Sequence, residues 1–203
     1  GVDVPHVLVK RDGLPDWNGP VGLYDEVDDT DDTDDTDDTG DADSRSVTSS
    51  GGEVLDHTAT GAAPMWDQDG VHEIYREWRA VLDSYGAPDR ILCAEAWVTP
   101  ESRLARYVRP DEMHQAFNFD FLDAHWDATA ISSAVESALR SNDNVGAPTT
   151  WVLSNHDVVR HASRLGLDQS LPRPNGITAD DPQPDAVLGL RRARAATALM
   201  LAL

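Results

Sequence analysis

The sequence predicts an α/β fold in which strands and helices alternate along the chain. Apolar runs at residues 90–98, 116–121 and 149–153 have the length and composition of buried strands. Residues 71–85 and 130–139 carry apolar side chains at helical spacing, and each stretch precedes one of these strands. Such alternation is typical of a parallel sheet with right-handed crossovers, and four such units make half of an eight-stranded barrel.

The remaining elements complete this pattern. Valines alternate with polar residues over residues 1–10, which predicts a strand that passes directly into a loop, with Asp3 at or near its end. The other segments are a long loop at 14–64, a short helix at 101–108, a Pro- and Asp-rich loop at 166–184 and an amphipathic helix at 187–203.

The acidic charge of the chain is concentrated in one tract. The formal net charge is -21, and 12 of the 37 Asp and Glu residues fall within 25–43, which has no Lys or Arg. Because this tract cannot bury apolar surface and repels itself, we expect residues 25–60 to be a disordered loop insertion in a single domain spanning 1–203. Asp35, Asp37 and Gly40 match part of a calcium loop, but Ser46 stands where the required Glu would be, which disfavours dedicated calcium binding.

Composition also limits the partners and the location of the protein. The negative charge argues against nucleic acid, and the apolar C-terminal stretch is too short to span a membrane. Cys93 is the only cysteine and lies in an apolar run, so we expect a buried, inert thiol. The chain starts without Met and stops inside a helical pattern, so we expect it to be a piece of a longer protein. We further expect a cytoplasmic location.

Three carboxylates fall at the C-terminal ends of expected strands: Asp3, Glu95 and Asp157. In a barrel these ends converge on one face, where the chemistry is carried out. Carboxylates gathered there suit glycoside chemistry, in which one attacks the anomeric carbon and another protonates the leaving oxygen. Glu95 suits the acid role, since its apolar neighbours disfavour the charged form.

Structural explanations compete with this hypothesis. A lone Asp after a strand is most often a cap or loop residue, which applies to Asp3. Residues 155–157 are equally consistent with an Asx turn or a helix cap. The spacing of the His residues is not that of metal ligands, and no serine nucleophile motif occurs.

Several stretches, taken in order, resemble the α-amylase family of glycoside hydrolases. The residues that carry the second, third and fourth signature regions are Asp3-Val4-Pro5-His6 with its continuation to Asp16, Ala94-Glu95-Ala96-Trp97, and Asn155-His156-Asp157 with Arg160. Residues 66–78 and 115–121 are similar to the α-glucosidase and oligo-1,6-glucosidase branch. The resemblance implies a partial (β/α)8 TIM barrel comprising about strands 4–7 with their helices.

By this resemblance Asp3 is the nucleophile, Glu95 the general acid/base and Asp157 the stabiliser of the transition state. His156 would hydrogen-bond the sugar at the cleavage site, and Arg160 and His6 would lie near the substrate. The resemblance further implies hydrolysis of α-glucosidic bonds in short oligosaccharides of the maltose or isomaltose type, with retention of configuration and without a cofactor. No set of metal ligands is identifiable.

The sequence departs from the family pattern beside the nucleophile. The family has an Arg two residues before it, which would hold the carboxylate ionised and oriented, and Gly1 occupies that position here. Two further functions therefore stay open. One is a transglycosylase or isomerase of the same family, and the other is a non-catalytic binding or scaffold relative.

Overall fold

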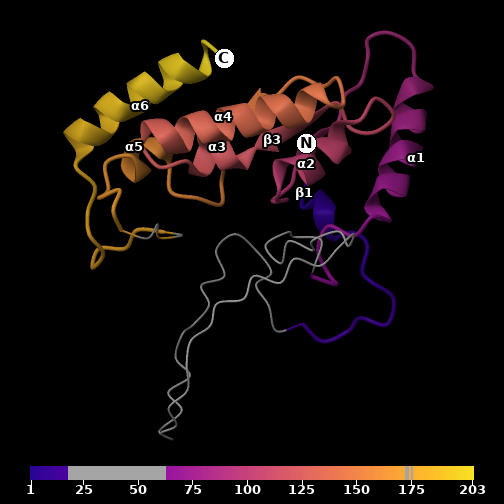
Figure 1. Cartoon of the computed structure of the whole chain (residues 1–203), viewed down its shortest axis with the longest axis horizontal. Coiled ribbons are helices and arrows are strands. Elements are labelled where there is room, and N and C mark those ends of the chain that lie inside the picture. Colours follow the sequence, from indigo (N-terminus) through magenta and orange to yellow (C-terminus); the bar gives the residue numbers. More distant parts are fainter. Residues whose placement is uncertain (18–62, 172–173, 175) are drawn as a thin grey trace, which may run out of the picture.

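The structure of the chain is a computed structural model that describes residues 1–17, 63–171, 174 and 176–203 (Figure 1). In these residues the strands form one parallel sheet, with spatial order β1-β2-β3-β4 and helices in every connection. This confirms the predicted alternation. The expected 25–60 insertion and the partial calcium loop lie outside the described residues. The strands are β1 (Val2–Asp3), β2 (Cys93–Glu95), β3 (Gln115–Asn118) and β4 (Thr150–Trp151).

Helices α1, α4 and α6, and the pair α2 and η3, lie where helices were predicted, with small shifts at their ends, whereas η1, α3 and α5 were not predicted. In Figure 1, α1 lies at one end of the molecule and α6 at the other, with α3 and α4 between them. The helical elements are η1 (Pro5–Val7), α1 (Val71–Asp83), α2 (Glu101–Leu104), η3 (Ala105–Val108), α3 (Phe119–Asp123), α4 (Ala128–Asp143), α5 (His161–Arg164) and α6 (Ala186–Met200). None of the described helices combines the length and apolarity needed to cross a bilayer.

All three apolar runs extend beyond the strands that form in them, and the run at 149–153 contributes only Thr150–Trp151. In the 90–98 run only Cys93–Glu95 join the ladder, and Ile91 is exposed. The run at 116–121 was expected to be strand throughout, but its second half is helix α3. The cause is Asn118, whose side-chain oxygen accepts a hydrogen bond from the Phe121 N–H at 2.6 Å and caps the helix.

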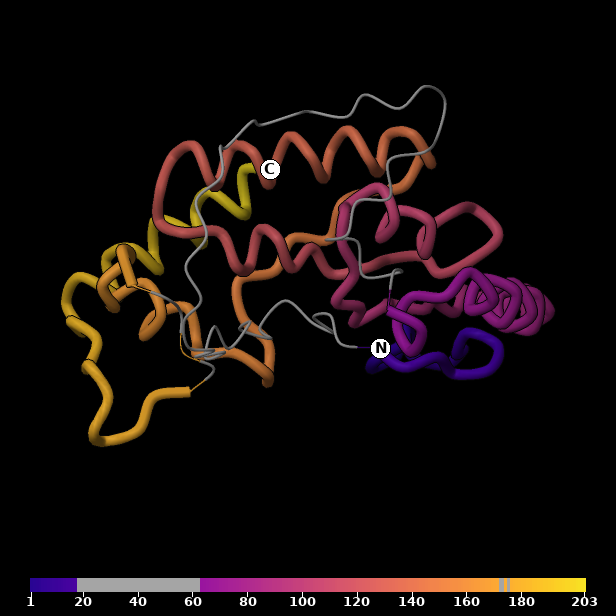
Figure 2. The backbone as a smooth tube through the Cα atoms, turned by 60° about the horizontal axis from the view of Figure 1, so that its bottom comes forward, coloured from indigo at the N-terminus to yellow at the C-terminus, as the bar shows by residue number. Residues whose placement is uncertain are grey.

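The hydrophobic core lies between the start of the sheet and the helices that follow β1 and β2. It is formed by small residues of β2 and larger ones of α1 and η3, so the strand can approach both helical elements closely. The N-terminal segment lies beside α1 (Figure 2). The buried core residues are Val71, Tyr75, Ala94, Ala96, Val98, Leu104, Tyr107, Val108, Met113 and Ala116.

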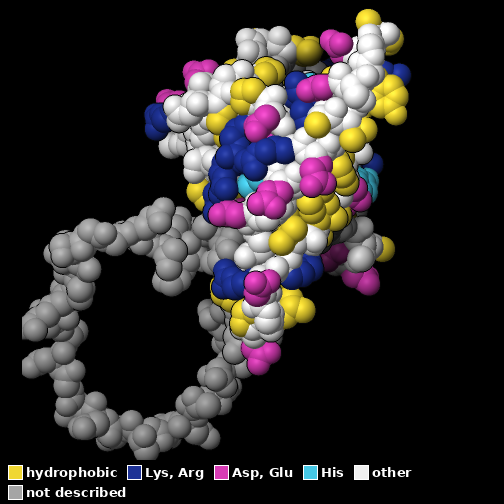
Figure 3. Space-filling view, turned by 90° about the vertical axis from the view of Figure 1, so that its right-hand side faces the viewer, with side chains coloured by type: hydrophobic (Ala, Val, Ile, Leu, Met, Phe, Trp, Pro, Cys, Tyr) yellow, Lys and Arg dark blue, Asp and Glu magenta, His cyan; other side chains and the backbone are white. Residues whose placement is uncertain are grey.

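Buried charges beside this core are satisfied by ion pairs. The Asp67 carboxylate accepts hydrogen bonds from the Tyr107 hydroxyl at 2.7 Å and from Arg103 Nε at 2.5 Å. Glu112 contacts His72 at 2.6 Å and is also paired with two arginines. Such pairing is needed because an isolated buried charge costs several kcal/mol. Figure 3 shows basic side chains interspersed with carboxylates on the α1 side of the molecule.

Candidate active site

Asp3 and Glu95 are the last residues of adjacent parallel strands. They are partners in the ladder, in which Val2 lies opposite Ala94 and Asp3 opposite Glu95. Because the carboxyl ends of parallel strands open at the same edge of a sheet, the two side chains leave the sheet from neighbouring positions. The predicted location of both residues at strand ends is therefore confirmed.

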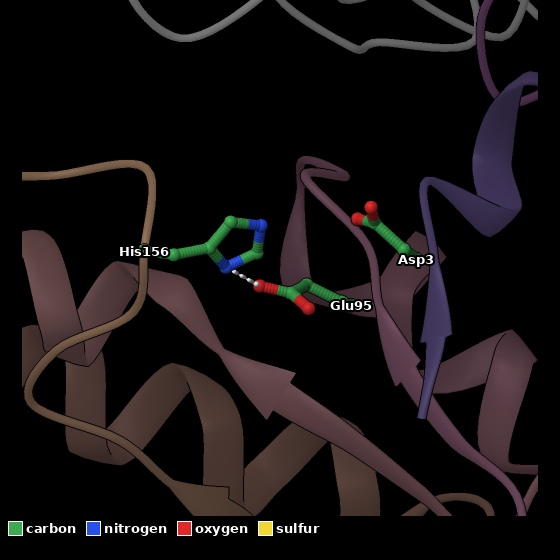
Figure 4. Close-up of side chains that lie close together, drawn as sticks. All are labelled: Asp3, Glu95 and His156. Atoms are coloured by element: carbon green, nitrogen blue, oxygen red, sulfur yellow. Dashed lines mark ion pairs between the residues drawn. The ribbon is translucent and has the colours of Figure 1, made fainter.

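His156 joins these two carboxylates from the loop after β4. One ligand atom of each of the three residues, Asp3, Glu95 and His156, lies within 4.8 Å of the other two. The Nδ1 atom of His156 is 3.3 Å from Glu95 Oε1 (Figure 4), and its Nε2 atom is 3.4 Å from Asp157 Oδ1. The Glu95 side chain is 17% exposed, whereas His156 and Asp157 are open to solvent. Asp157 is thus connected to the cluster through His156.

The loop that carries His156 is shaped by its own polar side chains. Asn155 Oδ1 accepts hydrogen bonds from the N–H groups of Asp157 at 3.1 Å and Val158 at 3.2 Å, which is the predicted Asx turn. The guanidinium of Arg160 donates to the carbonyl oxygen of Asn155 and folds back on the loop. The Asx turn and the proposed chemistry are compatible, because the turn sets the direction of the two side chains that follow it.

His6 differs from the other predicted site residues because it is fully buried. Its ring lies against Trp66, with ring centroids 4.3 Å apart. Burial, together with the nearby Lys10 ammonium, lowers the pKa of His6 to about 4, so the ring is neutral at pH 7. Neither ring nitrogen has a hydrogen-bond partner among the described residues. The structure places His6 in the packing around the Asp3 turn, and its contact with a sugar stays a prediction.

The backbone beside Asp3 is strained. Val4 has φ 48° and ψ 45°, a left-handed conformation that is unfavourable for a β-branched residue. It is followed by Pro5, whose carbonyl oxygen accepts a hydrogen bond from the Tyr75 hydroxyl. Such strain costs about 1–3 kcal/mol and persists only where surrounding contacts determine the conformation. Strain next to a carboxylate at a strand end is a feature of functional sites.

Cys93, the other titratable residue of β2, lacks the properties of a catalytic nucleophile. Cys93 is half-buried, and burial raises the pKa of its thiol. A thiol with a raised pKa is a poor nucleophile, because the thiolate is the reactive form. This agrees with the predicted inert cysteine, although the side chain is less buried than expected.

The cluster offers two kinds of chemistry. A pair of carboxylates this close can divide the roles of nucleophile and acid/base between them. The same oxygen and nitrogen atoms are also close enough together to ligate one divalent ion, with Asp3, Glu95 and His156 as ligands. The sequence predicts acid–base roles for these residues and no metal.

A parallel α/β sheet with carboxylates at adjacent strand ends is the arrangement of α/β proteins whose functional sites lie at the carboxyl edge of the sheet. Residues 22–176, more than half of the chain, match the family described as "Alpha amylase, catalytic domain". The chain therefore belongs to the α-amylase family. The matched region contains Glu95, His156 and Asp157, while Asp3 precedes it.

Curated relatives of the chain are named as glucosidases. It is 32% identical to Maltase A1 of Drosophila melanogaster over 124 residues, which are 57% of this chain and 21% of that protein. It is 33% identical to a salivary alpha-glucosidase of Anopheles gambiae over 121 residues, 56% of this chain and 19% of that protein. An alpha-glucosidase of Culex pipiens is 29% identical over 125 residues, with 57% and 20% covered. The chain spans about a fifth of the length of these relatives.

Trp66 also lies at this edge, but its residue type alone does not identify it as a site residue. It lies outside the strand ends, in the turn before α1, and its indole N–H donates to the Trp97 carbonyl oxygen at 2.8 Å. The resemblance of residues 66–78 to the glucosidase branch is the one sequence signal at this position. That signal indicates ancestry and does not indicate a role.

Proposed function

We propose that the chain forms about strands 4–7 of a (β/α)8 barrel that cleaves α-glucosidic bonds with retention of configuration. The separation of Asp3 and Glu95 carries this proposal. Retaining enzymes hold their two carboxyl groups about 5–5.5 Å apart, whereas inverting enzymes need roughly 6.5–9.5 Å to admit a water molecule. Oxygen atoms of Asp3 and Glu95 within 4.8 Å of each other fit the retaining geometry.

The reaction follows from this geometry in two steps. Asp3 attacks the anomeric carbon while Glu95 donates its proton to the leaving oxygen, which forms a covalent glycosyl ester on Asp3. Glu95, now ionised, then takes a proton from a water molecule that attacks the anomeric carbon, which breaks the bond to Asp3 and frees its carboxylate. In this mechanism His156, which lies between Glu95 and Asp157, hydrogen-bonds the sugar, and Asp157 stabilises the positive charge of the transition state.

The substrate class is supported by the relatives. Two of them are named maltase and alpha-glucosidase, which favours short α-linked glucosides of the maltose or isomaltose type. The arginine of the fourth signature stretch, Arg160, is exposed and lies near this cluster on the same loop as His156. We propose that it contacts the substrate.

The first test is hydrolysis of an aryl α-glucoside by the full chain beside Glu95→Gln. We expect turnover by the wild type and a fall in kcat of about 10²–10⁴-fold in the variant, because general acid–base catalysis is lost. Glu73→Gln, an exposed position on α1, is the matched control and should leave kcat unchanged. Proton NMR of the first-formed product should show the α-anomer.

Three results would redirect the proposal. The β-anomer as first product would exclude the retaining mechanism. A new disaccharide in place of free glucose would indicate the transglycosylase or isomerase function. No turnover by the wild type, combined with binding of maltose, would favour the non-catalytic relative, for which Gly1 in place of the family's Arg is the supporting observation.

A further inference from the structure

Trp66 contacts the segments that follow both predicted catalytic carboxylates. Its ring lies against His6, three residues after Asp3, with centroids 4.3 Å apart and planes inclined by 55°. Its indole N–H donates at 2.8 Å to the carbonyl oxygen of Trp97, two residues after Glu95. One side chain therefore links two segments that lie about 90 residues apart in the sequence.

The turn that carries Trp66 is itself firmly held. The Asp67 N–H donates to the His6 carbonyl oxygen at 2.7 Å, so this turn is bonded to the Asp3 side through the backbone as well. Asp67 has φ 48°, a left-handed conformation, and its buried carboxylate is fixed by Tyr107 and Arg103. A turn fixed by buried charge-assisted hydrogen bonds is a rigid support for the indole.

The link matters because the β ladder ends at the carboxylates. Asp3 and Glu95 are the last paired residues of β1 and β2. Val4 then adopts its strained conformation, and Trp97 leaves the strand to stack on Phe119 at 4.0 Å. The ladder fixes the backbone of Asp3 opposite that of Glu95, and contacts past its end further restrain the segments that carry the two side chains.

We propose that Trp66 is a positioning residue that, together with the ladder, holds the separation of the Asp3 and Glu95 carboxylates. The catalytic part of this inference rests on the proposed function. Reacting groups must be held within about 0.5 Å of the productive geometry, so loss of the link lowers the rate more than it lowers substrate affinity. Trp66→Phe removes the N–H donor and keeps an aromatic ring against His6.

Hydrogen exchange measured by mass spectrometry tests the link without reference to activity. In Trp66→Phe we expect amide exchange to rise about five- to tenfold in both residues 1–9 and residues 93–99, the effect of one lost hydrogen bond. Trp78→Phe, a tryptophan of α1 that is exposed, is the matched control and should change neither segment. A rise in only one segment, or in neither, would overturn the link.

A second measurement needs no variant and so does not depend on the folding of one. The indole proton of Trp66 in the wild type should exchange at least about 100-fold more slowly than that of Trp78, since one is hydrogen-bonded and the other is open to water. Equal exchange of the two indole protons would overturn the proposal.

Kinetics then test the positioning role separately. In the active wild type, Trp66→Phe should lower kcat for an aryl α-glucoside about tenfold with KM within about twofold, because a misplaced pair weakens the transition state. If Trp66→Phe increases amide exchange but leaves kcat unchanged, Trp66 is only a structural link, and its positioning role is overturned. If the wild type has no activity, the proposed function and the positioning role fall together, and exchange alone decides the link.

Discussion

Replacing Glu112 by glutamine is expected to lower the free energy of unfolding by about 3–5 kcal/mol, the cost of breaking a buried ion pair by removing one partner. The Glu112 side chain is 0% exposed, and its carboxylate pairs with Arg109, with Arg76 at 3.3 Å and with His72 Nδ1 at 2.6 Å. Glutamine keeps the shape of the side chain but removes its charge. Its NH2 group also places a hydrogen-bond donor against partners that are themselves donors. Arg76 and Arg109 would then share no buried counter-charge.

Asp111, the residue before it, provides the matched control. Its side chain is 61% exposed and pairs with Arg76 at 3.0 Å. An exposed pair of this kind contributes about 0–1 kcal/mol, so Asp111→Asn should shift the urea midpoint only slightly. Urea denaturation followed by circular dichroism measures both variants. Equal losses in the two variants would mean that burial does not strengthen the Glu112 network.

Replacing Glu101 by glutamine should stabilise the protein, with an effect that grows with pH. Glu101 is 4% exposed, and burial, with a smaller contribution from Asp120, raises its pKa to about 8 from an ordinary value near 4.5. The Nδ2 group of Asn118 donates to its Oε1 atom at 2.8 Å, a bond that the glutamine oxygen can also accept. The substitution therefore removes a titrating group and keeps its packing and its hydrogen bond.

The sign of the effect follows from proton linkage. Below about pH 4.5 Glu101 is protonated in both the folded and the unfolded chain and contributes nothing. Between pH 4.5 and 8 the unfolded chain releases this proton while the folded chain retains it, so stability falls as pH rises. Glu101→Gln removes that loss and should gain on the order of 4 kcal/mol at pH 8 and almost nothing at pH 4.

Urea denaturation at a series of pH values measures this difference. Glu136→Gln, an exposed position on α4, is the control and should run parallel to the wild type. Burial also raises the pKa of Asp120, so part of the decline with pH should remain in the Glu101 variant. A constant difference between Glu101→Gln and wild type across pH 4–9 would exclude the titration of Glu101 as its cause.

The helices and the location of the two strand-end carboxylates could be predicted from the sequence. Helices α1 and α4 follow from apolar spacing, which directly reflects burial of one face. Asp3 and Glu95 could be placed at strand ends because a charge next to an apolar run has to lie where the strand leaves the core. That Asp157 lies near the same edge followed from the same reasoning applied to the run at 149–153.

Where each strand ends could not be predicted, because the apolar run continues past the last ladder pair. At residues 119–121 the alternation indicates a strand, yet the Asn118 cap starts a helix there. Local capping and packing prevail over a pattern that helix and strand share. Similarly, Ala96 and Val98 are as apolar as the strand before them but pack into the core from the loop.

The sequence alone determined which residues carry the carboxylates. It also determined that these residues follow successive strands of a parallel sheet. Tertiary structure decided which groups meet. It brought His156 onto Glu95, buried His6 against Trp66 and linked the two carboxylate segments through one indole. Such contacts join residues about 30–60 positions apart, and no local periodicity encodes them, because they depend on the register of the strands and the paths of the turns.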